Sequence, residues 1–142
     1  MKRTALLILA AVAAIGLVTA GCGSSSSSGG SKEAAITVEK QASGLSLLTL
    51  SERASQRLGV QTAQIRELAG QKLIPYAAIV YDATGATWTY AVVSALAFQR
   101  APIVVASIDG EEAVLTDGPT AGTAVVTVGA AELYGAEIGV GG

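Results

Sequence analysis

Side chains that commonly carry catalysis or bind transition metals are scarce in this sequence. It contains no histidine, and its single cysteine is Cys22. A serine or cysteine nucleophile is activated by an imidazole base, so Ser-His-Asp and Cys-His catalysis are excluded. Zinc and copper sites use histidine and cysteine ligands, so we expect no metal site of that kind. A lone cysteine also leaves no internal disulfide.

Paired carboxylates are the remaining route to acid–base catalysis, but the acidic residues fall in turn sequences. Glu111 and Glu112 are adjacent, so on a strand their side chains would face opposite sides. Asp82 and Asp117 follow apolar runs, where aspartate typically bonds to the local backbone of a turn. Neither turn has the alternating oxygen ligands of a calcium loop. We therefore predict no catalytic residue, no metal and no cofactor, and a protein that is not an enzyme.

The aromatic residues are candidates for a binding face. Trp88 and Tyr90 are two positions apart, so on a strand they share one face. With Tyr81 they would form an exposed platform for a sugar or an apolar ligand. In the alternative interpretation that face belongs to the core, because the chain has few other large side chains to fill an interior.

Basic residues are too few and too dispersed for a nucleic-acid site. The chain has 9 Lys and Arg against 11 Asp and Glu, a net charge of −2. Nucleic acids and anionic bilayer surfaces attract clusters of positive charge, so both partners are set aside. Arg53, Arg57 and Arg66 are interpreted either as a modest polar docking face or as an ordinary solvated surface.

Residues 1–21 have the layout of a secretion signal. The chain starts Met-Lys-Arg, and its apolar run over residues 5–18 is shorter than the roughly 20 residues that span a bilayer. Residues 18–22 read Val-Thr-Ala-Gly-Cys, which resembles the lipobox of bacterial lipoproteins, with Thr19 where leucine is commoner. The resemblance implies that Cys22 is lipidated and anchors the protein to the extracytoplasmic side of a cell membrane. The alternative, an ordinary signal with an incidental cysteine, would leave an unpaired thiol in an oxidising compartment.

A tether and one domain are expected after Cys22. Residues 22–33 are dominated by serine and glycine, including the unbroken run Ser24–Ser28. Such a composition buries no apolar surface, so we predict a flexible, lipid-anchored linker over residues 22–33. Residues 34–138 are then long enough to close one hydrophobic core without disulfides.

The domain is predicted to be all-β, a small β-roll or barrel-like fold with one short helix. Ser51 is a typical N-cap and Gly59 a typical stop for a helix over Glu52–Leu58. Asp109-Gly110 between apolar runs is typical of a hairpin turn. The predicted strands cover Leu45–Leu50, Val60–Ile65, Ala78–Tyr81, Thr87–Val93, Ile103–Ile108, Ala113–Thr116 and Thr123–Val128, and a single helical turn follows at Ala130–Tyr134. Short strands joined by Gly, Asp and Pro turns favour a roll, a barrel or a sandwich.

Two stretches resemble the periplasmic adaptor (membrane-fusion) proteins of bacterial efflux pumps. Residues 45–63, which end Arg57-Leu58-Gly59-Val60-Gln61-Thr62-Ala63, are similar to the adaptor segment in which a strand and short helix lead into Leu-Gly-Val-x-Thr-Ala. Residues 74–130 resemble the C-terminal, membrane-proximal β-domain, on the motifs Ile74-Pro75-Tyr76, Thr87-Trp88-Thr89-Tyr90, Ala113–Gly118 and Gly122–Ala130.

In the adaptors, a lipoyl-like domain, a β-barrel and a long helical hairpin separate the two stretches. Here the gap between them is only about Arg66 to Leu73. The resemblance therefore implies a membrane-proximal domain without its inserted arm, in which Leu45–Leu50 pairs with strands of the Pro75–Val128 half. Excision of the arm can leave a closed fold because domain insertions sit where the chain enters and leaves at nearby points.

The resemblance implies a non-catalytic accessory role in transmembrane transport. Without the hairpin the chain cannot reach an outer-membrane channel, but docking on the extracytoplasmic face of a transporter stays open. The alternative is a surface lipoprotein that binds a glycan or a small apolar ligand, and a third interpretation is an adaptor remnant without a partner. The candidate docking or ligand face consists of Arg53, Arg57, Trp88 and Tyr90, and Cys22 is the lipidation site.

Overall fold

A computed structural model of the protein describes residues 35–140, which belong to one compact unit of the chain, Ser31–Gly142. These residues form an all-β fold of two sheets with short helices, which confirms the fold class predicted from the sequence. Cys22, the predicted secretion signal and the predicted tether lie outside the described residues.

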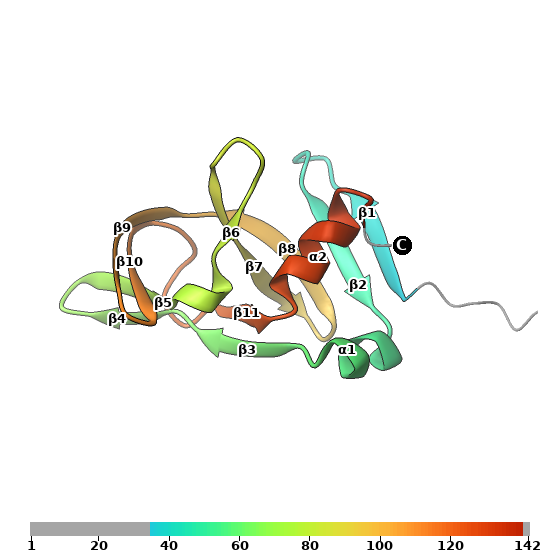
Figure 1. Ribbon diagram of the computed structural model, residues 1–142, viewed down its shortest axis with the longest axis horizontal. Helices are drawn as coiled ribbons and strands as arrows, with labels where there is room; N and C mark the ends of the chain where they lie inside the picture. Colours follow the sequence, from blue (N-terminus) through green and yellow to red (C-terminus); the bar gives the residue numbers. More distant parts are fainter. Residues whose placement is uncertain (1–34, 141–142) are drawn as a thin grey trace, which may run out of the picture. The chain divides into compact units, whose positions relative to one another are not determined.

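The larger sheet contains seven strands (Figure 1). Its neighbours are, in order, β1 (Ile36–Lys40), β2 (Ser46–Leu50), β8 (Ala97–Pro102), β7 (Thr87–Ser94), β11 (Ala124–Val128) and β3 (Gln61–Gln64), and β6 (Val80–Tyr81) also pairs with β7. Strand β2 is antiparallel to β8, with Leu48 opposite Phe98. This pairing confirms that the segment Leu45–Leu50 joins a strand of the Pro75–Val128 half, so the two halves of the chain close into one sheet.

The smaller sheet contains four strands. Its order is β4 (Arg66–Leu68), β5 (Gln71–Pro75), β10 (Glu112–Asp117) and β9 (Val104–Asp109). Strands β9 and β10 form the predicted hairpin, with Asp109 opposite Glu112 across the turn. The turn needs a left-handed residue, and Gly110 supplies it with a φ of 59°, which costs glycine no steric strain.

Helix α1 (Glu52–Leu58) has the predicted bounds and the predicted caps. The Oγ of Ser51 accepts a hydrogen bond of 3.2 Å from the backbone N–H of Ala54, which satisfies one of the free donors of the first turn. Gly59 ends the helix in the left-handed region with a φ of 60°. Capping chemistry therefore fixes both ends of this short helix, and its one buried residue, Ala54, faces the core.

Two helical segments differ from the prediction. Helix α2 (Ala130–Glu137) continues beyond the predicted single turn Ala130–Tyr134, and its last residue, Glu137, is bonded to Tyr90 of the sheet. A 3₁₀ helix, η1 (Tyr76–Ala78), replaces the first residue of the predicted strand Ala78–Tyr81. The N–H of Ile79 bonds to the carbonyl of Tyr76, so this part of the backbone is paired within the turn and not across a sheet.

The described residues contain two hydrophobic clusters, and β11 lies between them. One cluster gathers residues of β2, α1, β6, β7, β8, β11 and α2, and the other gathers residues of β5, η1, β10, β11 and the adjoining loops. Val126 belongs to the first cluster and Val125 to the second, and both are 0% exposed. Strand β11 is buried on both sides, whereas Val128 is 41% exposed.

Candidate functional site

Tyr90 is a core residue and not part of an exposed face. Its side chain is 0% exposed and belongs to the larger hydrophobic cluster. Its hydroxyl donates a 2.6 Å hydrogen bond to Oε2 of Glu137 on α2. Burial, and then the bond to the Glu137 carboxylate, raise the pKa of Tyr90 well above its usual 10.0. The assignment of Tyr90 to a docking or ligand face is therefore wrong.

Arg100 connects β7, β8 and α2 beside this tyrosine. It lies directly opposite Tyr90 in the β7–β8 pairing, and its Nη2 lies 3.3 Å from Oε1 of Glu137. Its guanidinium carbon lies 4.2 Å from the ring centroid of Trp88 and 5.9 Å from that of Tyr134, so the cation rests on aromatic faces. The Arg100 and Glu137 side chains are 18% and 6% exposed. A buried ion pair with aromatic walls thus fastens α2 to the sheet.

Trp88 is engaged at both its ring face and its ring nitrogen. Arg100 covers one face, and Nε1 donates a 2.9 Å hydrogen bond to Oδ2 of Asp82. The other Asp82 oxygen accepts bonds from the hydroxyl and N–H of Thr84 and from the N–H of Ala86. Trp88 is half-buried, so with Tyr90 in the core these side chains do not make the predicted aromatic platform. Both side chains have a structural role: Trp88 holds the β6–β7 turn through Asp82, and Tyr90 bonds to Glu137 on α2.

The pKa of Asp82 should be measurable from the fluorescence of Trp88. Hydrogen bonds from Thr84 and then from Trp88 lower the pKa of this carboxyl from 3.8 to about 2. Because the folded-state pKa is lowered, the contribution of Asp82 to stability is present above pH 3.8 and is lost as the pH falls through about 2.

Trp88 is the only tryptophan, so we expect its fluorescence to titrate with a midpoint near pH 2. Asp82→Asn should remove this transition. A midpoint at or above pH 3.8, with the fold intact by circular dichroism, would contradict it.

Arg53 and Arg57 lie on the exposed side of α1. They are four positions apart, so their side chains are neighbours on the helix surface. The ion pairs within residues 35–140 are Arg66 with Glu112 and Arg100 with Glu137, so neither arginine of α1 is in one. Two positive side chains therefore lie on the exposed side of α1 without an ion-pair partner among residues 35–140.

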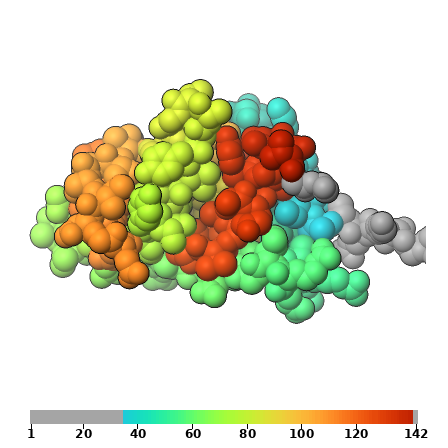
Figure 2. Space-filling model, in the orientation of Figure 1, coloured from blue at the N-terminus to red at the C-terminus, as the bar shows by residue number. Residues whose placement is uncertain are grey.

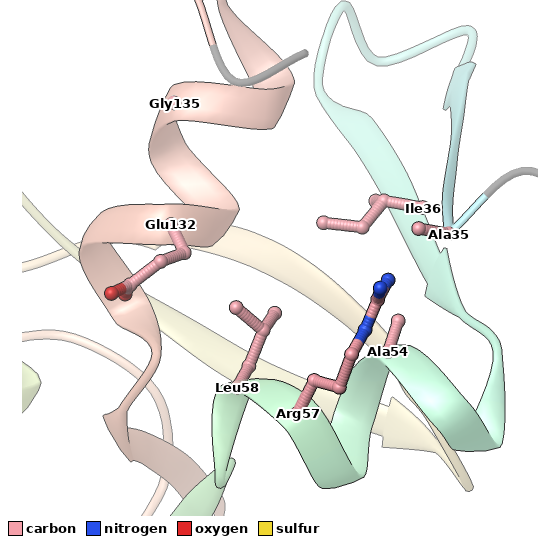
Figure 3. Close-up of a pocket in the computed structure, with 7 residues that line it drawn as sticks. All are labelled: Ala35, Ile36, Ala54, Arg57, Leu58, Glu132 and Gly135. Atoms are coloured by element: carbon pink, nitrogen blue, oxygen red, sulfur yellow. The ribbon is translucent and has the colours of Figure 1, made fainter.

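A pocket of about 320 Å³ lies beside Arg57 (Figure 3). It is an open pocket lined by residues of α1, the start of β1 and α2, and Figure 2 shows these three segments side by side on one face of the unit. Most of the lining is aliphatic or glycine. The lining residues are Ala35, Ile36, Ala54, Arg57, Leu58, Glu132 and Gly135. This volume is at the small end of the roughly 300–1,000 Å³ of typical small-molecule pockets.

The two charged residues of the pocket point in different directions. In Figure 3 the Arg57 guanidinium extends between α1 and Ile36, whereas the Glu132 carboxylate points away from it. The side chains of Leu58 and Ile36 extend into the space between the two helices and β1. The pocket therefore has a mostly aliphatic lining, with the Arg57 cation on one side and the Glu132 carboxylate on another.

Sequence reasoning found some of these residues and missed others. It singled out Arg57 but not the pocket, because helix α2 and strand β1 are distant in sequence and their meeting is a tertiary event. It missed Arg100 and Glu137 as well. Phe98 and Arg100 share a strand face, so a buried Phe98 would have indicated an inward-pointing Arg100 and a buried acid to pair with it.

No three metal-ligating side chains meet anywhere in residues 35–140. Neither α1 nor α2 is long or apolar enough to cross a membrane. Comparisons with protein-family models, with curated proteins and with solved structures found no match to this chain. Its function is therefore inferred from the geometry of the described residues and from its sequence motifs.

Proposed function

We propose that this protein is a membrane-tethered, non-catalytic accessory protein of transmembrane transport. Acyl chains on Cys22 anchor it to the extracytoplasmic side of the membrane, and its β-domain docks on the extracytoplasmic face of another envelope protein. The position of α1 is the main support for this proposal. The arginine-bearing face of this helix lies beside Ala35, where the described chain begins and from where it runs back to Cys22.

The tether keeps this face close to the bilayer. Ala35 follows Cys22 by thirteen residues. Even a fully extended chain spans only about 3.3–3.6 Å per residue, so α1 stays within roughly 45 Å of an anchored cysteine. That reach covers the extracytoplasmic loops of a neighbouring membrane protein, and it favours a partner that is itself in the membrane.

Charge indicates the kind of surface that would bind. Two like charges four positions apart on a helix repel by about 0.2–0.5 kcal/mol, and an acidic partner surface would relieve this repulsion. Charge complementarity of this type raises association rates and selects partners more than it raises affinity. We therefore expect an acidic patch on the partner facing Arg53 and Arg57.

Charge reversal at Arg53 tests the docking face. Arg53→Glu should reduce co-purification of the lipidated protein with a multi-pass membrane protein by about tenfold, because it replaces an attractive charge with a repulsive one. Arg53 is exposed and is not a pocket residue, so the variant should fold. Lys40→Glu is the matched control, since Lys40 is an exposed residue at the far end of β1. The measurement is quantitative mass spectrometry after affinity capture from native membranes.

Equal capture by the Arg53→Glu and wild-type proteins would contradict docking through α1. Equal loss in Arg53→Glu and Lys40→Glu would also contradict it, because the effect would then come from total charge and not from this face. A loss confined to Arg53→Glu, in protein with unchanged thermal stability, is the result that the proposal requires.

A second candidate function is the capture of a small apolar ligand at the cell surface. The pocket between α1, β1 and α2 favours this function over glycan binding. Glycan recognition by stacking needs an exposed aromatic platform, and here Tyr90 is in the core and Arg100 covers one face of Trp88. An apolar ligand needs only the aliphatic floor that the pocket supplies.

A further inference from the structure

We infer that the pocket between α1, β1 and α2 binds a fatty acid, with the acyl tail on its aliphatic floor and the carboxylate at Arg57. This inference rests on the second candidate function, ligand capture, and names its ligand class. It does not depend on whether α1 also docks on a partner protein.

The lining selects a flexible apolar tail. Ile36, Ala54 and Leu58 supply aliphatic surface, and Gly135 leaves room on the α2 side. A Cβ at position 135 would meet only Val140 within 4 Å, at 3.8 Å, so nothing else in the described chain fills this space. The lining contains no aromatic side chain and no polar side chain other than Arg57 and Glu132. A ring-stacking or multiply hydroxylated ligand would find no matching group there.

Arg57 selects the head group. The planar guanidinium donates parallel hydrogen bonds to a carboxylate, which an alcohol or an ammonium group cannot accept in the same way. Within residues 35–140 this arginine is free of an ion pair, so its donors are available. Glu132 points away from Arg57 and would repel an anion on its own side, which directs a carboxylate toward the Arg57 end.

The position of the pocket matches the source of such a ligand. Ala35 is both a pocket residue and the first described residue, so the pocket lies at the point from which the chain runs to the proposed anchor. Fatty acids partition into bilayers because burial of each methylene is favourable. A pocket held within the reach of the tether is therefore next to the phase in which fatty acids concentrate.

Photo-crosslinking tests the inference on the lipidated full-length protein. The protein is placed in neutral phosphatidylcholine nanodiscs with a diazirine analogue of palmitic acid, and adducts are mapped by mass spectrometry. We expect labelling of α1 and α2 that excess dodecanoate suppresses. Gly135→Met should lower it about tenfold by filling the pocket, whereas Gly135→Ala should leave it unchanged, since alanine suits the helix interior.

Arg57→Gln tests the head group. This variant should lower labelling by the carboxylate probe about tenfold, the equivalent of one charge-assisted hydrogen bond, and Arg57→Lys should restore part of it. Labelling by the corresponding alcohol probe should stay unchanged in both variants. Equal effects on the two probes would overturn the assignment of the carboxylate to Arg57.

Two results would overturn the inference as a whole. One is the absence of labelling on α1 and α2 of the wild-type protein. The other is labelling that occurs only after Cys22→Ser removes the protein's own acyl chains, because those chains would then be the occupant. Neither result affects capture through Arg53, so failure of the ligand inference and failure of the docking proposal can be told apart.

Discussion

Replacing Glu137 with alanine should lower the free energy of unfolding by about 3 kcal/mol, the low end of the range for breaking a buried ion pair. The substitution leaves the Arg100 guanidinium uncompensated in a site where its side chain is only 18% exposed. It also removes the acceptor for the buried Tyr90 hydroxyl. Most of the loss in unfolding free energy comes from leaving the Arg100 charge and the Tyr90 hydroxyl buried without a partner, and less from the net strength of the ion pair itself.

Urea denaturation followed by Trp88 fluorescence measures this effect. Glu132→Ala on the same helix is the control, because Glu132 is exposed and makes no ion pair within residues 35–140. Glu137→Gln should fall between the two, since it keeps an acceptor for Tyr90 but not the charge for Arg100. Equal midpoints for the Glu137→Ala and Glu132→Ala proteins would show that the network does not fasten α2.

The bonds that Glu137 makes to Arg100 and Tyr90 also help to position the α2 wall of the pocket. Glu132 and Gly135 lie on the pocket wall, and α2 ends at Glu137. Leu133, which is 0% exposed, and the Glu137 pair therefore hold this wall from two sides, one by apolar burial and one by charge. The position of this wall therefore depends on Tyr90 of β7 and Arg100 of β8. Both strands are distant in sequence from α1, which lines the opposite side of the pocket.

Local chemistry made part of the fold predictable. Helix α1 and the β9–β10 hairpin depend on caps and turn residues within a few positions, at Ser51, Gly59 and Gly110, so the sequence alone identifies them. Strands β7, β10 and β11 follow from apolar runs with turns beside them. In each of these cases the controlling interaction is local, and tertiary context does not override it.

Strands with polar interiors could not be predicted in the same way. Strand β8 carries Gln99 and Arg100 in its centre, and β5 begins with Gln71 and Lys72, so neither shows an apolar period. Their strand form depends on the partners that pair with them, which are β7 and β2 for β8 and β10 and β4 for β5. The burial of the Arg100 charge likewise depends on a distant partner, because its carboxylate, Glu137, lies near the C-terminal end of the chain.

The candidate site could be predicted only in part, for the same reason. Periodicity places Trp88 and Tyr90 on one side of a strand but does not say whether that side faces solvent. The structure places Tyr90 in the core, beside a cluster that includes Leu48 and Phe98. A pocket formed by segments far apart in the sequence leaves no local sequence pattern. Of its lining residues, only Arg57, an exposed arginine on a helix, could be identified as a candidate from the sequence.

A chain with Cys22→Ser, exported behind an ordinary cleavable signal in place of residues 1–21, should leave the membrane fraction almost completely. Each buried methylene of an acyl chain contributes about 0.8 kcal/mol to membrane binding, and several chains on one cysteine make release negligible. Without them the described unit has no helix that could span a bilayer to retain it. Fractionation and immunoblotting measure the change, and Ser24→Ala with the native residues 1–21 is the control that should stay in the membrane.

Persistence of the Cys22→Ser protein in salt-washed membranes would mean that something other than acyl chains anchors it. Docking alone could then account for membrane association, and the role of the tether would have to be abandoned. Loss of the protein from the membrane, with an unchanged melting temperature, is the expected combination, because Cys22 lies outside the compact unit Ser31–Gly142.

We propose that lipid on Cys22 holds the β-domain at a membrane surface. Intact-mass and peptide mass spectrometry of the protein isolated from its native membrane would detect this lipid. We expect a chain that begins at Cys22 and carries a diacylglyceryl thioether on that residue. A chain that retains residues 1–21, or one with an unmodified Cys22 thiol, would contradict it.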